Sequence, residues 1–123
     1  MTGAPILIVE DDRDIQDNLK FFLETEGFPV VSAMNGQEAI DYLRSGEPIR
    51  LILLDLMMPI MDGYEFLAAT LRDEAIVLRR APIVLVSAVP DIEKIARQYG
   101  LRYLKKPINL DRLLAAILAT APS

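Results

Sequence analysis

The sequence predicts an α/β domain in which a five-stranded parallel sheet is covered by helices on both faces. Short apolar runs alternate five times with longer segments whose apolar residues recur at helical spacing. Strands that are joined by helical crossovers run parallel, with right-handed connections. The runs at residues 5–9 and 51–54 are apolar at every position, as strands are when helices cover both faces of their sheet.

The expected strands are the short apolar runs that end at turn signals or polar residues. They are residues 5–9, 29–33, 51–54, 82–86 and 102–105. Pro29 is acceptable because it stands first in its strand, where a sheet tolerates proline. For five strands, the doubly wound, flavodoxin-like arrangement has the order 2-1-3-4-5, with its switch point between strands one and three.

The expected helices are identified by apolar stripes and by signals at their ends. The stripes are Ile15, Leu19, Phe22 and Leu23; Ala39, Ile40 and Leu43; Phe66, Leu67 and Thr70; Ile92, Ile95, Ala96 and Tyr99; and Leu110, Leu113, Leu114 and Ile117. The signals for helix starts are Asp12 or Asp14, Asn35 with Gly36, Gly63, Pro90, and Asn109 or Asp111. The signals for helix ends are Gly27 and Gly46. The end of the third helix is not defined by the sequence between residues 73 and 80.

Length and composition limit the possible functions. A chain of 123 residues predicts one domain, residues 1–123, without an output domain. The chain has no Cys and no His, which excludes Ser–His–Asp and Cys–His triads, and its glycines match no nucleotide-binding spacing. We expect no membrane span and no signal peptide, hence a cytoplasmic protein. The net charge of −5 argues against direct nucleic-acid binding.

Polar side chains follow the strands that the predicted order brings together. Glu10 and Asp11 follow the first strand, Asp55 the third, Ser87 the fourth and Lys106 the fifth. The carboxyl ends of parallel strands form the ligand crevice of such sheets. Two carboxylates ~5 Å apart repel by about 3 kcal/mol at an effective dielectric of ~20, so cations are needed. Lys106 can offset part of this repulsion, and a hard divalent cation such as Mg²⁺ can offset the rest.

The cluster therefore predicts a site for a phosphoryl group held between a metal ion and a lysine. Asp55 is the natural nucleophile, because a carboxylate can form an acyl phosphate. The Ser87 hydroxyl can donate a hydrogen bond to a phosphoryl oxygen. Each residue taken alone also has an ordinary interpretation, with Ser87 bonding to the backbone at a strand end and Lys106 lying solvated at the surface.

Five short motifs in this order make the chain similar to the receiver domain of two-component response regulators, which has the CheY-like fold of the single-domain chemotaxis regulator. They are Glu10-Asp11, Asp55 followed by Met-Met-Pro-Ile-Met-Asp-Gly, Ser87-Ala88, Tyr103, and Lys106-Pro107. The resemblance covers essentially the whole chain. It implies a signalling module that catalyses only its own phosphorylation and the slow loss of the phosphoryl group.

The resemblance also implies roles for the site residues. Asp55 would accept a phosphoryl group from a phosphohistidine on a sensor histidine kinase or a histidine phosphotransfer protein. Mg²⁺ would be the only cofactor, bound directly by Asp11, through water by Glu10, and by Asp55 and the backbone carbonyl of Met57. The Lys106-Pro107 bond would be cis.

The signal would then pass to a downstream protein. Ser87 would shift toward the phosphoryl group and Tyr103 would rotate inward, which changes the surface of the fourth helix, fifth strand and fifth helix. The resemblance leaves open a monomer or a weak, phosphorylation-dependent dimer. We expect the kinase to dock on exposed positions of the first helix and on Pro107-Ile108, because these residues surround the crevice.

Two departures from the family pattern carry expectations of their own. Met57 and Val89 flank the phosphoryl site, and neither side chain can hydrogen-bond an attacking water, so we expect slow loss of the phosphoryl group. The segment between Ser87 and Lys106 is shorter than usual by about one helical turn, which predicts a short helix from Asp91 to about Tyr99.

Three alternatives to a stand-alone regulator fit the sequence less well. An Asp-nucleophile phosphatase of the haloacid-dehalogenase type needs a second Asp at position 57, where this chain has Met. A flavin-binding domain needs a phosphate loop rich in Ser and Thr where this chain has Glu10-Asp11-Asp12. A degenerate receiver that serves as a scaffold would have lost Asp11, Asp55 or Lys106, and all three are present.

Overall fold

The computed structural model describes residues 3–58, 61–72 and 81–120. Its strands are β1 (Ile6–Val9), β2 (Val30–Ala33), β3 (Leu51–Leu54), β4 (Ile83–Ser87) and β5 (Arg102–Lys105). Its helices are α1 (Arg13–Thr25), α2 (Gly36–Arg44), α3 (Gly63–Arg72), α5 (Ile92–Tyr99) and α6 (Leu110–Ala119). Residues 73–80, where the sequence left the end of a helix open, lie outside the described residues.

The strands form one parallel sheet in the order β2-β1-β3-β4-β5, which confirms the predicted doubly wound topology. In the register of β1 and β3, Ile6 pairs with Leu51 and Val9 pairs with Leu54. The two central strands therefore end side by side. The residues that follow them, Glu10 and Asp55, leave the sheet at the same edge.

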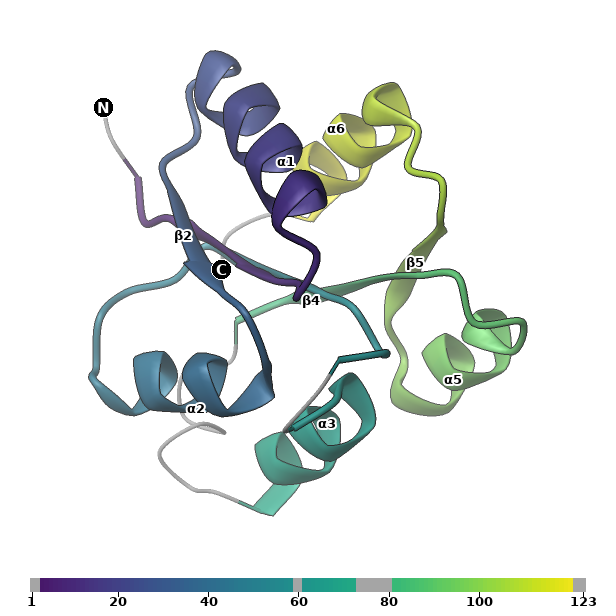
Figure 1. Cartoon of the computed structure of the whole chain (residues 1–123). Coiled ribbons are helices and arrows are strands. Elements are labelled where there is room, and N and C mark those ends of the chain that lie inside the picture. The colour runs from purple at the N-terminus through teal and green to yellow at the C-terminus, as the bar shows by residue number, and fades with distance from the viewer. Residues whose placement is uncertain (1–2, 59–60, 73–80, 121–123) are drawn as a thin grey trace.

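Helices cover both faces of the sheet, as the fully apolar strands require. Figure 1 shows α1 and α6 on one face and α2, α3 and α5 on the other. Alternate strand residues supply the two cores, because successive side chains point to opposite faces. Leu7 and Val9 pack on the side of α2, α3 and α5, whereas Ile6 and Ile8 pack on the side of α1 and α6.

Side-chain caps fix where several of the helices begin, among them α1, α2 and α6. Asp12, and not Asp14, caps α1, and its Oδ1 accepts hydrogen bonds from the backbone N–H groups of Asp14 and Ile15 at 2.9 and 3.1 Å. Asn35 caps α2 through the N–H of Glu38 at 2.9 Å. For α6 the cap is Asn109 and not Asp111. Such caps each stabilise a helix by about 1 kcal/mol.

Two expectations about the last helices have different outcomes. The predicted short helix is confirmed, because α5 has 8 residues and Ile92, Ile95 and Ala96 are buried. The predicted stripe of α6 is wrong at its first position, since Leu110 is 42% exposed while Leu113 and Ile117 are buried. Leu110 is the first residue of its helix and lines a hollow beside α1 instead of the core. Among the described residues, no helix combines the length and the apolar character needed to cross a bilayer.

Candidate functional site

Strand pairing delivers the acidic residues to one edge of the sheet. The backbone N–H of Asp55 donates to the carbonyl of Val9 at 3.0 Å, and the N–H of Glu10 donates to the carbonyl of Ala33 at 3.0 Å. These bonds extend the strand ladders one residue beyond the strands. The backbone at Glu10 and Asp55 is therefore as fixed as the sheet itself.

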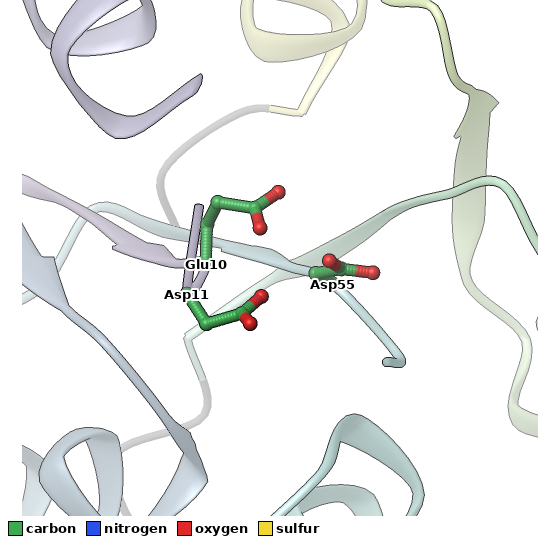
Figure 2. A group of neighbouring side chains, drawn as sticks. All are labelled: Glu10, Asp11 and Asp55. Carbon is green, nitrogen blue, oxygen red and sulfur yellow. The ribbon is translucent and has the colours of Figure 1, made fainter. Parts of the chain in front are cut away.

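Three carboxylates gather at this edge. Glu10, Asp11 and Asp55 each offer one oxygen, and these oxygens all lie within 4.8 Å of one another. Figure 2 shows that Glu10 and Asp11 come from the chain after β1, and Asp55 from the chain after β3. Glu10 is 3% exposed and Asp55 is 5% exposed, whereas Asp11 faces solvent. The cluster is thus open on the side of Asp11.

Lys106 connects two of these carboxylates. Its Nζ lies 2.5 Å from Oε1 of Glu10 and 3.0 Å from Oδ2 of Asp55. The backbone N–H of Lys106 donates to the carbonyl of Ser87 at 3.0 Å, so the loop after β5 is held at the end of β4. The Lys106-Pro107 bond is cis, as the resemblance implied. We call Glu10, Asp11, Asp55 and Lys106 the acidic pocket.

The acidic pocket has more negative than positive charge. Burial, together with the nearby charge of Asp55, raises the pKa of Glu10 to about 7 even though Lys106 and the Asp12 N–H bond to it. Burial acts to lower the pKa of Lys106, but its bonds to Glu10 and Asp55 outweigh this effect and raise the pKa. Lys106 therefore stays charged, and one lysine faces three carboxyl groups. This imbalance and the all-oxygen ligand set fit a hard divalent cation such as Mg²⁺.

The remaining hydrogen bonds of Asp55 come from its own loop. The backbone N–H of Met57 donates to Oδ1 of Asp55 at 3.1 Å, which places the Met57 backbone next to the carboxylates. Gly63 is required nearby, because a Cβ on Gly63 would lie 2.5 Å from the carbonyl oxygen of Asp55. The sequence indicated only that a helix starts near Gly63. In the structure, Gly63 also lets α3 pack directly against the chain that carries Asp55.

In the part of the chain that the structure describes, the side chains of the two switch candidates form no hydrogen bond with the carboxylates. Ser87 is fully buried, and its Oγ accepts a hydrogen bond from the N–H of Val89 at 3.5 Å. Among the described residues no hydrogen bond joins Ser87 to Asp55. Tyr103 is 36% exposed on β5, so its side chain lies at the surface.

Sequence reasoning missed Gln16, which is buried among the main chain of the site. Its Nε2 group donates to the carbonyls of Ile8, Glu10 and Ala33 at 2.8, 3.2 and 3.0 Å. A signal was available, because position 16 lies three and seven residues before Leu19 and Leu23 and therefore on the buried face of α1. A glutamine at such a position needs polar partners inside the protein.

A hollow of about 580 Å³ lies beside the acidic pocket, between α1 and the chain after β5. Its lining includes Ile15, Leu19, Phe21, Phe22, Ile108 and Leu110, and Lys106 reaches it as well. Phe21 is 75% exposed, which is unusual for so large an apolar side chain. We call this feature the apolar hollow.

This fold, with acidic residues after β1, an Asp after β3 and a Lys after β5, is that of a signal receiver. The chain belongs to the response regulator receiver domain family, whose model matches residues 6–118. It is 37% identical over 119 residues to the transcriptional regulatory protein CpxR of Escherichia coli (strain K12), covering 93% of this chain and 47% of that protein. It is also 37% identical over 117 residues to the cell cycle response regulator CtrA of Brucella ovis, covering 93% of this chain and 48% of that protein. The chain thus spans about half the length of these curated relatives.

Solved structures agree with this family. The response regulator protein TrrA from Thermotoga maritima, in complex with Mg(2+)-BeF, has a TM-score of 0.82 at 28% identity, covering 97% of this chain and 100% of that chain. A CheY-like receiver domain protein from Methanospirillum hungatei JF-1 has a TM-score of 0.79 at 30% identity, covering 95% and 94% of the two chains. The predicted family and the predicted fold are both confirmed.

Proposed function

We propose that this receiver domain accepts a phosphoryl group on Asp55 in a reaction that depends on Mg²⁺. One observation carries the proposal, namely that the Nζ of Lys106 bonds both Glu10 and Asp55 while Asp11 lies beside them. A buried carboxylate next to a fixed amine and two further acidic groups is suited to hold a phosphoryl group together with a divalent cation.

In the proposed reaction a carboxylate oxygen of Asp55 attacks phosphorus. A P–O bond forms to Asp55 while the P–N bond of the donor phosphohistidine breaks. The leaving imidazole nitrogen keeps the electron pair of that bond and takes a proton from solvent. Lys106 holds its positive charge at Asp55 throughout, and the Met57 N–H fixes the direction of the carboxylate. The Ser87 hydroxyl is proposed to donate to a phosphoryl oxygen after its bond with Val89 is released.

The residues present fit Mg²⁺, which would be held by Asp11, Asp55 and the Met57 carbonyl, with Glu10 acting through water. The bound ion supplies positive charge that offsets the phosphoryl oxygens. The proposal is supported by the three-carboxylate cluster and by the similarity to TrrA, a protein solved in complex with Mg(2+)-BeF. We propose no cofactor besides Mg²⁺. We also propose no catalytic activity beyond the phosphorylation of Asp55 and the slow loss of its phosphoryl group.

The phosphoryl donor is proposed to be a sensor histidine kinase or a histidine phosphotransfer protein that docks over the apolar hollow. The hollow lies next to Asp55 through the shared Lys106, and exposed Phe21 offers an apolar contact to a partner. The output is proposed to be a downstream protein that reads the surface of α5, β5 and α6, where Tyr103 lies exposed. The net charge of −5 supports an output through protein contacts and not through nucleic acid.

The test is phosphorylation by a small donor. The protein is incubated with acetyl phosphate and MgCl₂, and its intact mass is measured. We expect a base-labile phosphoryl adduct in the wild type and in Asp62→Asn, a matched change at the start of α3. We expect no adduct in Asp55→Asn or when EDTA replaces Mg²⁺. An adduct that persists in Asp55→Asn would overturn the proposal.

A further inference from the structure

Gln16 holds the main chain that carries the acidic residues. Its side chain is 3% exposed, and its Nε2 group donates to three carbonyls: that of Ile8 within β1, that of Glu10 just after β1, and that of Ala33 at the end of β2. The amide oxygen has no hydrogen-bond partner among the described residues. Every hydrogen bond that this side chain makes in the described part of the chain therefore runs through its NH₂ group.

Gln16 also contacts the other end of the acidic turn. Its backbone N–H donates to the carbonyl of Asp12 at 2.9 Å, as the first turn of α1 forms. The turn of Glu10, Asp11 and Asp12 is thus held by one residue at both ends, through the side chain at Glu10 and through the backbone at Asp12.

The bond to Glu10 has a direct consequence for Asp11. The carbonyl of Glu10 and the N–H of Asp11 belong to one rigid peptide plane. Fixing the oxygen of that plane fixes the direction in which the chain enters Asp11. Because the Asp11 side chain is exposed, packing does not hold it, and its direction depends on the backbone.

We propose that Gln16 is a positioning residue for metal binding, which aims the carboxylates of Glu10 and Asp11 by holding the peptide between them. The inference rests on the proposed Mg²⁺ site. It goes beyond that proposal because Gln16 lies behind the strand ends and bonds only to main-chain carbonyls. Loss of partners that orient metal ligands typically weakens metal affinity by about 10–100-fold.

The test is a titration of ¹⁵N-labelled, unphosphorylated protein with MgCl₂, followed through backbone amide shifts in NMR spectra. Gln16→Met keeps the length of the side chain and removes its donors. Leu23→Ala is the matched control, because Leu23 is buried two turns later in α1, packs in the core on the side of α1 and α6, and lines neither the acidic turn nor the apolar hollow. Thermal unfolding of each variant in EDTA shows how much stability each change removes.

We expect Gln16→Met to bind Mg²⁺ about tenfold more weakly than wild type, and Leu23→Ala to bind as wild type despite its lower stability. Equal Mg²⁺ affinity of Gln16→Met and wild type would overturn the inference, as would an equal loss of affinity in both variants. If Gln16→Met does not fold, Gln16→Asn is used instead. The asparagine side chain is shorter by one CH₂, so its NH₂ group lies farther from the three carbonyls and the variant should also bind Mg²⁺ more weakly. Failure of the wild type to bind Mg²⁺ would instead overturn the proposed metal site on which this inference rests.

Discussion

The acidic pocket and the apolar hollow lie next to each other and share Lys106, but they are built in opposite ways. The pocket collects residues from the chain just after β1, β3 and β5, which are far apart in the sequence. The hollow is formed mainly by one face of α1, with Ile108 and Leu110 on its other side. The pocket is rich in charge, whereas most of the side chains that line the hollow are aliphatic or aromatic.

The difference indicates a division of tasks. Charged groups that converge on Asp55 can act on a phosphoryl group from any donor, large or small. An apolar surface can matter only for a donor large enough to touch it. Changes in the acidic pocket should therefore alter phosphorylation by every donor, and changes in the apolar hollow should alter only transfer from a protein.

The largest effect is expected from Lys106→Met, which removes the charge that Glu10 and Asp55 share. The rate of phosphorylation by acetyl phosphate should fall by about 100-fold, the typical loss when one charge-stabilising donor is removed. Removal of one partner of a buried ion pair should also lower the free energy of unfolding by about 3 kcal/mol. Adduct formation followed by mass spectrometry and urea unfolding measure the two effects.

Lys105→Met is the control for this change, because Lys105 is the exposed neighbour of Lys106. It should leave both the phosphorylation rate and the stability close to those of the wild type. If both variants lost phosphorylation rate and stability equally, the effect of Lys106→Met would not come from its ion pairs with Glu10 and Asp55.

The next largest effect separates the two regions. Phe21→Ala should slow phosphoryl transfer from a histidine kinase that phosphorylates this protein by about tenfold, because an exposed aromatic residue often dominates an interface. The rate with acetyl phosphate should not change. Leu118→Ala is the matched control, since Leu118 is 62% exposed but is not part of the lining of the hollow. If Phe21→Ala slowed phosphorylation equally with the kinase and with acetyl phosphate, the hollow would not act on protein donors alone, and the prediction would be wrong.

A third prediction concerns the lifetime of the phosphorylated state. Met57 is 61% exposed beside Asp55, and neither Met57 nor Val89 has a side chain that can orient a water. The double variant Met57→Asn with Val89→Glu should lose phosphoryl faster by roughly tenfold, since the two new hydrogen bonds to the attacking water are together worth about 1–2 kcal/mol. The decay of phosphorylated protein in Mg²⁺ buffer measures this lifetime, and unchanged decay would refute the prediction.

The last prediction concerns the pH dependence of the stability of the metal-free protein. The pKa of Glu10 is raised to about 7 from an ordinary 4.5, so the folded state binds a proton that the unfolded state has lost between these values. The free energy of unfolding in EDTA should therefore rise as pH falls from about 7 toward 4.5, and decrease as pH rises again. Glu10→Gln should remove this part of the pH dependence, and identical pH profiles of the two proteins would contradict it.

Sequence pattern was enough for the fold and for the members of the acidic pocket. The apolar runs fixed the strands, and the parallel topology then placed Glu10, Asp55 and Lys106 at one edge without knowledge of any side-chain contact. The local sequence pattern predicted the ends of the helices less well than their presence. Asp12 and Asp14 were equal candidates to cap α1. The structure decides for Asp12 through its extended backbone, at φ −77° and ψ 114°, and through the two hydrogen bonds that its side chain accepts.

The features that the sequence did not predict depend on packing between distant segments. Gln16 looks like one polar residue of an amphipathic helix until the three carbonyls that it bonds are known. Helical spacing assigned Leu110 to the core, but spacing does not show that the first turn of α6 lines the hollow. The hollow itself follows from the approach of α1 to the chain after β5, which no local pattern encodes.

The most direct test of the central claim is to locate the phosphoryl group. Protein phosphorylated by acetyl phosphate and Mg²⁺ is reduced with borohydride, which converts an aspartyl phosphate to homoserine, and its peptides are sequenced by mass spectrometry. Our account predicts homoserine at position 55 and unmodified Asp at positions 11 and 62. Homoserine at either of those positions, with Asp55 unmodified, would contradict it.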